Sequence, residues 1–116
     1  MIIVSDTTPL ITLMKRSQIE ILESLFHEIL IPEAVYSELT TNHSFPDEIE
    51  YIRNCEFIRI VQVKERKSVD VLQRSSGLDL GESEAIIYAD DNKADVLLMD
   101  EAKGRKVAAA MGLKIM

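Results

Sequence analysis

Two aspartates directly follow short apolar runs, a placement that suits metal or phosphate chemistry. Asp6 comes after the β-branched run 2–5, and Asp100 comes after the apolar run 96–99. If both runs are strands of one parallel sheet and are neighbours in it, the carboxylates share the carboxyl edge, where open α/β sheets bind ligands. The alternative is that each aspartate caps the helix that follows it. For Asp6 this alternative is weaker, because Thr8 already stands at a favourable cap position.

Two glutamates are expected on the inward side of helices. Glu38 lies three residues after Val35 and one before Leu39, beside an apolar stripe. Glu82 lies in the first turn of another expected helix, three residues before Ala85. An inward carboxylate is costly unless it is paired or bound to a metal. The alternatives are a partly exposed flank for Glu38 and a favourable interaction with the helix dipole for Glu82.

Together, these four carboxylates predict a divalent metal site. Converging from separate elements, they would repel one another strongly unless a cation lay between them. Mg²⁺ or Mn²⁺ fits an all-oxygen ligand set, and the sequence does not distinguish the two ions. A zinc site is not expected, since His27 and His43 have no partners at ligand spacing. The sequence also lacks a glycine-rich phosphate loop and a nucleophilic triad.

The elements that must position these residues alternate between strands and helices. Strands are expected at 2–5, 28–31, 57–63, 95–99 and 113–116, and helices from Thr8, from Pro32 and over 47–54, 68–75, 81–93 and 101–111. Strands without polar alternation are typically buried on both faces. Helical crossovers between strands indicate a parallel sheet. The sequence therefore predicts a three-layer α/β/α domain with a parallel sheet of four to five strands.

Length and composition fit one domain and restrict its partners. The chain has 116 residues, of which 47% are hydrophobic, enough for one core. Its net charge of −7 argues against general nucleic-acid binding and suits a cation or a basic partner. No apolar run approaches the roughly 20 residues of a membrane span, and Asp6 interrupts the apolar start that a signal peptide would need. The single Cys55 fits a cytoplasmic protein without disulfides.

Four motifs resemble the PIN-domain family. They are Val-Ser-Asp-Thr-Thr-Pro-Leu-Ile at 4–11, Leu-Ile-Pro-Glu-Ala-Val-Tyr-Ser-Glu-Leu at 30–39, Gly-Leu-Asp-Leu-Gly-Glu-Ser-Glu-Ala-Ile at 77–86 and Leu-Leu-Met-Asp-Glu at 97–101. The likeness extends in order over nearly the whole chain, and four linked motifs are more specific than any one. It is greatest to the small prokaryotic PIN proteins that are similar to the VapC toxins.

This resemblance implies a Mg²⁺- or Mn²⁺-dependent endoribonuclease. The residues that match the metal-binding and catalytic positions are Asp6, Glu38, Glu82 and Asp100, with Glu101 as an extra acid. Thr8 matches a hydroxyl position beside the first aspartate. Apart from the resemblance, Arg105, with Lys103 and Lys106, is a candidate for holding the RNA backbone, and the alternative is that these are solvated charges near a helix C-terminus. A cation in the acidic pocket would attract phosphate even though the protein is acidic.

The resemblance also implies partners and a domain boundary. Toxins of this type are usually paired with an antitoxin protein, and an unfinished sheet edge favours a homodimer. Chains of the family continue for some tens of residues beyond the last strand. We therefore expect residues 1–116 to be a single PIN-like domain that lacks its C-terminal segment.

Two other functional classes compete with the nuclease. A catalytically impaired PIN-like domain would act only as a protein-interaction or antitoxin-binding partner. A receiver-like phosphoryl-transfer domain also groups aspartates at strand ends, but the expected third strand ends at Gln62-Val63-Lys64 without a carboxylate.

Overall fold

A computed structural model of the protein describes residues 1–41 and 46–116, so the expectation for His43 lies outside the described residues. The sheet has four strands in the order β3-β2-β1-β4, and every neighbouring pair is parallel. The strands are β1 (Ile3–Ser5), β2 (Ile29–Pro32), β3 (Ile58–Val61) and β4 (Val96–Leu98). The predicted parallel α/β architecture is confirmed.

The expected fifth strand at 113–116 is reduced to one parallel bridge. Ile115 pairs with Leu97, outside the named strands. The backbone N–H of Leu97 donates to the carbonyl of Lys114 at 2.8 Å, and that of Met116 donates to Leu97 at 3.0 Å. The segment after the last helix therefore lies beside β4.

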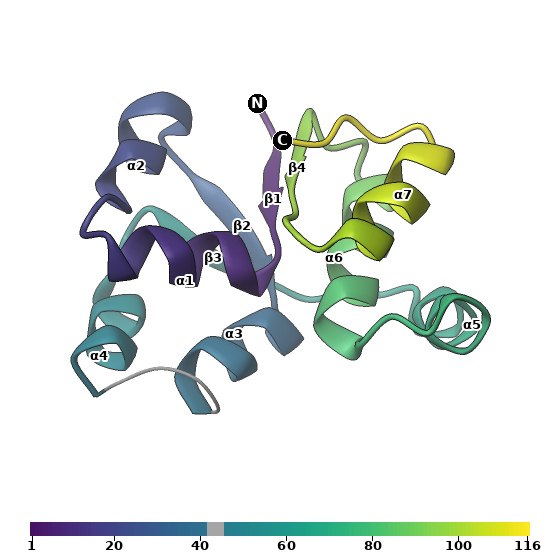
Figure 1. The fold of residues 1–116 in the computed structure, drawn as a ribbon, viewed down its shortest axis with the longest axis horizontal. Coiled ribbons are helices and arrows are strands. Elements are labelled where there is room, and N and C mark those ends of the chain that lie inside the picture. The colour runs from purple at the N-terminus through teal and green to yellow at the C-terminus, as the bar shows by residue number, and fades with distance from the viewer. Residues whose placement is uncertain (42–45) are drawn as a thin grey trace.

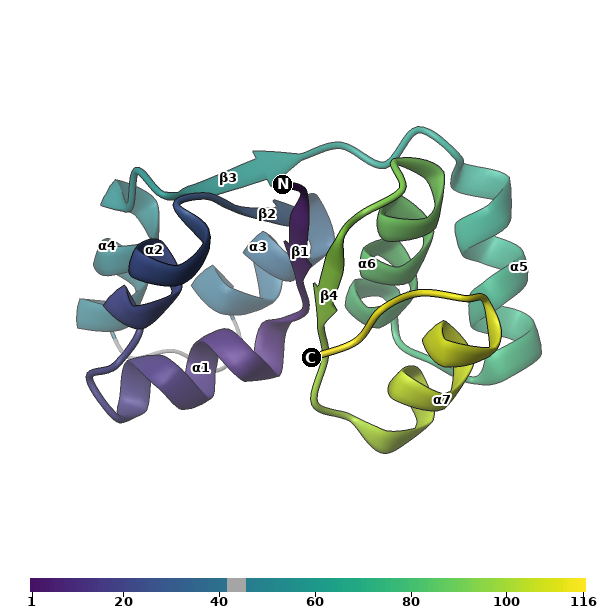
Figure 2. The same ribbon diagram turned by 90° about the horizontal axis from the view of Figure 1, so that it is seen from above.

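The helices form two layers, one on each face of the sheet. They are α1 (Thr7–Lys15), α2 (Glu20–Phe26), α3 (Glu33–Thr41), α4 (Pro46–Asn54), α5 (Arg66–Ser76), α6 (Leu80–Asp91) and α7 (Ala102–Ala110). Figures 1 and 2 show α1 to α4 on one side and α5 to α7 on the other. No helix in the described ranges is long and apolar enough to cross a membrane.

Strands β1 and β4 contribute to both cores, because successive side chains of a strand point to opposite faces. Ile3 and Leu98 belong to the core that includes buried residues of α1, α2, α3 and α4. Val4 and Leu97 belong to the core that includes residues of α6 and α7. The two faces account for the unbroken apolar runs in the sequence.

The order of the sheet places a switch point between β1 and β4. From β1 the chain passes through β2 and β3 on one side, and then returns to place β4 on the other. Ile3 pairs with Val96, and Ser5 pairs with Leu98. The carboxyl ends of both strands therefore lie side by side, as the position of a ligand crevice requires.

The prediction that Thr8 caps the first helix is wrong. Helix α1 begins at Thr7, and Asp6 takes the cap position with extended backbone, although its side chain makes no cap hydrogen bond. The alternative that Asp100 caps the last helix is also wrong, because Glu101 is the N-cap of α7.

Candidate active site

Asp6 lies at the carboxyl end of β1, at the switch point. Its backbone N–H donates to the carbonyl of Leu98 at 2.9 Å, so the residue is tied to the end of β4. The residue is 3% exposed, and an ionised carboxylate in such a place is costly without a compensating partner. Asp6 is therefore the residue around which a site can be built.

The pKa of Asp6 is raised from 3.8 to about 7. Burial is the largest cause, and the backbone N–H of Thr7 opposes it in part. Repulsion from Glu82, Asp79 and Glu38 raises the pKa further, in that order. Three of the four carboxylates predicted from the sequence are thus brought together, along with Asp79, which was not predicted.

Glu38 reaches the cluster because Gly81 has no side chain. A Cβ on Gly81 would lie 2.5 Å from Oε1 of Glu38 and 3.7 Å from Oδ1 of Asp79. Any side chain at position 81 would therefore displace the glutamate. The glycine lets a carboxylate from α3 lie against the first turn of α6.

Asp79 and Glu82 form a capping box at the start of α6. The N–H of Glu82 donates to Asp79 Oδ1 at 2.8 Å, and the N–H of Asp79 donates to Glu82 Oε1 at 2.9 Å. The pKa of Glu82 is raised, first by burial and then by repulsion from Asp79 and Glu101, while the Asp79 N–H partly opposes the shift. The Asp-x-x-Glu spacing is a capping signal in the sequence, and it could have identified Asp79.

Glu101, the extra acid of the sequence prediction, faces Glu82. Its carboxylate accepts from the N–H of Gly104 at 2.7 Å. Its pKa is lowered, first by this hydrogen bond and then by the N–H of Lys103. The pKa values of Glu82 and Glu101 are therefore shifted in opposite directions.

Asp100 is placed differently from the other three predicted carboxylates. It is exposed at the end of β4 and lines a hollow of about 320 Å³ between α1 and β4 that also includes Arg105. Nη1 of Arg105 donates to the carbonyl of Met99 at 2.8 Å. The predicted substrate residue Arg105 thus fixes the backbone next to Asp100, while Thr8 is exposed on α1.

The carboxylate oxygens are suitable ligands for a hard divalent cation, but they are not arranged as a preformed coordination site. Within 1–41 and 46–116, no group of three or more His, Cys, Asp or Glu residues is placed to hold a metal ion. One reason is that Glu82 is engaged in the capping box. In favour of a hydrated ion, the Thr7 hydroxyl beside Asp6 is buried and finds no hydrogen-bond partner among the described residues.

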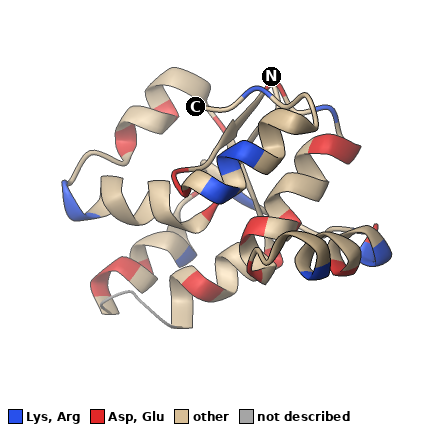
Figure 3. Ribbon diagram, turned by 45° about the vertical axis from the view of Figure 1, so that its right-hand side comes forward, with Lys and Arg blue, Asp and Glu red and all other residues tan. Residues whose placement is uncertain are grey.

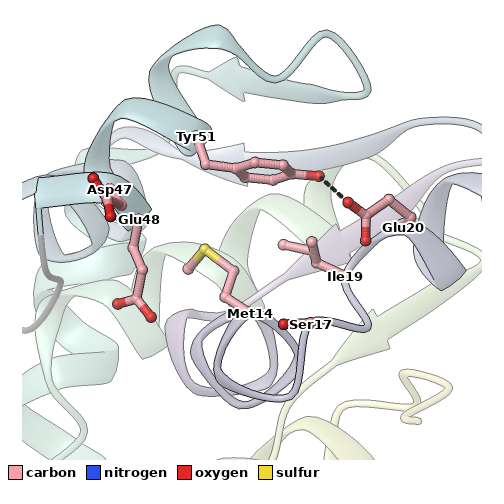
Figure 4. Close-up of a pocket in the computed structure, with 7 residues that line it drawn as sticks. All are labelled: Met14, Ser17, Ile19, Glu20, Asp47, Glu48 and Tyr51. Carbon is pink, nitrogen blue, oxygen red and sulfur yellow. Dashed lines mark hydrogen bonds between the residues drawn. The ribbon is translucent and has the colours of Figure 1, made fainter.

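A second cavity lies away from this cluster. It encloses about 220 Å³ and is lined by residues of α1, the α1–α2 turn, α2 and α4, namely Met14, Ser17, Ile19, Glu20, Asp47, Glu48 and Tyr51. Figure 4 shows the Tyr51 hydroxyl directed at Glu20, to which it donates at 3.5 Å. None of the clustered carboxylates lines this cavity, so we place the candidate site at the sheet edge instead.

Charge alone does not single out a surface. Figure 3 shows acidic and basic residues interspersed over the helices. The net charge of −7 is therefore not concentrated on one helix. The distinctive feature of the cluster is that its central carboxylate, Asp6, is buried at the switch point, where charges interact more strongly than on the surface.

These features define a three-layer α/β protein with an acidic cluster at the carboxyl edge of its parallel sheet. A family model described as a PIN domain matches residues 2–116. The chain belongs to the PIN-domain family, as the sequence motifs predicted. PIN domains are generally nucleases and generally use divalent metal ions. No curated protein matches the chain.

Proposed function

We propose that this protein is a divalent-metal-dependent endoribonuclease of the VapC toxin type, which hydrolyses RNA phosphodiester bonds. The observation that carries the proposal is the convergence of Glu38, Glu82 and Asp79 on the buried Asp6 at the switch point. Carboxylates that raise the pKa of a buried neighbouring carboxylate are typical of functional sites. Membership of a family of nucleases supplies the reaction class.

The residues proposed to hold Mg²⁺ or Mn²⁺ are Asp6, Glu38, Glu82 and Asp100. When bound, the ion would supply activation of a water and neutralisation of charge on the phosphate. Asp6 provides a fixed, buried carboxylate, because its backbone is tied to β4. Glu82 has to exchange its hydrogen bond with the Asp79 N–H for the ion, at a cost of about 1 kcal/mol.

The proposed roles in RNA binding fall on α1 and α7. Thr8 is exposed on α1 two residues after Asp6, and its hydroxyl can donate to a phosphate oxygen. Arg105 keeps donors besides the one that binds the Met99 carbonyl, because a guanidinium carries five. Lys103 donates to the carbonyl of Gly77 at 3.3 Å and so stands near the start of α6.

Titration calorimetry of Mn²⁺ into the wild-type protein, with RNA cleavage assayed on the same samples, tests the proposal. Asp6→Asn removes the central carboxylate and is expected to abolish both binding and cleavage. Asp70→Asn is the matched control, since Asp70 forms an exposed ion pair with Arg74 on α5 at 2.9 Å. A wild-type protein that binds no Mn²⁺ would refute the proposal.

A second candidate is a protein-binding domain without catalysis, whose partner is an antitoxin or a second copy of the chain. It is favoured by the absence of a preformed metal-binding group within the described ranges. Under this alternative the protein keeps its fold and binds its partner, but RNA stays intact at every Mn²⁺ concentration. Sedimentation of the purified protein over a range of concentrations tests for the homodimer.

A further inference from the structure

Glu84 is a buried carboxylate outside the acidic cluster. It lies on α6 and is 4% exposed. Its Oε1 accepts from the backbone N–H of Ala34 at 3.1 Å, and its Oε2 lies 2.8 Å from Nη1 of Arg66. One side chain therefore connects the start of α3, the start of α5 and the first half of α6.

The contact with α3 has a clear physical basis. Ala34 is the second residue of α3, so its N–H has no acceptor within the helix. The N-terminus of a helix also attracts negative charge. Glu84 thus caps α3 from a different helix, and Arg66 compensates the buried charge.

A second contact joins the same two helices, with the glutamate now coming from α3 instead of α6. Glu38 lies one turn beyond Ala34 on α3, and its carboxylate lies against Gly81 on α6. Gly81 lies one turn before Glu84. Helices α3 and α6 are therefore joined at two points, which lie one turn apart on each helix. A rotation or displacement that breaks one contact strains the second.

We infer that Glu84, fixed by Arg66, is a positioning residue that sets α3 against α6 and so holds Glu38 at the acidic cluster. Both of its carboxylate oxygens are engaged, one by the Ala34 N–H and the other by Arg66. The inference rests on the proposed function, because Glu38 is held in place here as a ligand of the proposed metal ion. Outer residues that orient metal ligands typically change affinity or activity by 10- to 100-fold when they are substituted.

Four variants test this inference. Glu84→Gln keeps an acceptor for the Ala34 N–H but loses the charge, and Arg66→Gln leaves Glu84 without its counter-charge. Arg66→Lys retains the charge and is the conservative rescue. Asp70→Asn is the control, because it removes an exposed ion pair on the same helix as Arg66.

The first measurements are Mn²⁺ affinity by calorimetry and the kcat and KM of RNA cleavage at saturating Mn²⁺. We expect Glu84→Gln and Arg66→Gln to weaken Mn²⁺ binding by about 10- to 100-fold and to lower kcat with KM unchanged. Arg66→Lys and Asp70→Asn are expected to stay within about threefold of the wild type. Wild-type affinity in folded Glu84→Gln and Arg66→Gln would overturn the inference.

A second measurement does not depend on metal. The backbone amide resonances of Gly81 and Glu38 report on the contact between α6 and α3, which lies one turn from the Glu84 contact on each helix. We expect Arg66→Gln to shift both resonances in EDTA, and Asp70→Asn to shift neither. If the wild-type protein binds no Mn²⁺, the proposed function fails, and unshifted resonances in Arg66→Gln would separately refute the positioning.

Discussion

The raised pKa of Asp6 predicts that the metal-free protein loses stability as pH rises. In the unfolded chain the carboxyl ionises near 3.8, whereas in the native state it ionises near 7. Between these values the native state binds the proton more tightly, so ionisation favours unfolding. Each pH unit across this interval lowers the free energy of unfolding by at most about 1.4 kcal/mol, so the total loss is on the order of 4 kcal/mol.

Asp6→Asn removes this titration. The amide has nearly the same shape but cannot ionise, so the variant is expected to be more stable than the wild type at pH 8 in EDTA. The difference should shrink as pH falls below 7 and vanish near pH 4. Urea unfolding followed by circular dichroism at pH 4 to 8 and constant ionic strength measures it, with Asp70→Asn as the exposed control.

Mn²⁺ is expected to narrow this difference. At a free concentration 100 times its Kd, a ligand that binds only the native state stabilises it by about 2.7 kcal/mol. The wild type should gain this stability at pH 7.5, and Asp6→Asn should gain none. The reasoning is refuted if the variant keeps the wild-type dependence on pH, or if it is less stable than the wild type at pH 8 without metal.

Substitutions at three other positions separate the roles of the remaining residues. Gly81→Ala adds a methyl group only 2.5 Å from Glu38 Oε1, so it should displace this carboxylate. Calorimetry should then show about tenfold weaker Mn²⁺ binding, with the free energy of unfolding changed by less than about 1 kcal/mol. Unchanged affinity would show that Glu38 is dispensable. Asp100→Asn should leave stability within about 0.5 kcal/mol, because Asp100 is exposed, and should lower cleavage by more than about 100-fold; an active variant would remove Asp100 from the site. Arg105→Met should lower the free energy of unfolding in urea by about 1 kcal/mol, because the hydrogen bond to the Met99 carbonyl is lost. If Arg105 also contacts phosphate, the slope of log K for RNA binding against log salt should become shallower by about one, and an unchanged slope would show that it does not.

The sheet and its switch point could be predicted because they depend on patterns within short segments. Apolar runs separated by helical periodicity indicate parallel strands, and an aspartate after each of two runs marks the carboxyl edge. Asp6 and Asp100 were placed at that edge from these patterns alone. The pairing of β1 with β4, on which the crevice depends, was stated as a condition and is found in the structure.

The arrangement of side chains at that edge could be predicted only in part. Asp and Thr are both favoured cap residues, so local sequence could not decide whether the first helix starts after Asp6 or after Thr8. The opening for Glu38 depends on the close approach of Gly81 from another helix, 43 residues later in the chain. The role of Glu84 likewise depends on contacts between helices, which no local pattern encodes.

The pairing of β1 with β4 has a consequence for synthesis of the chain on the ribosome. The Ile2 N–H donates to the carboxylate of Asp95, 93 residues later, and Ile3 pairs with Val96 next to it. At about 5 to 20 residues per second, the first strand waits roughly 5 to 20 s for this neighbour to be made. The nascent chain therefore carries an apolar strand with one unpaired edge until β4 is made, and such edges are where chaperones bind and nascent chains associate.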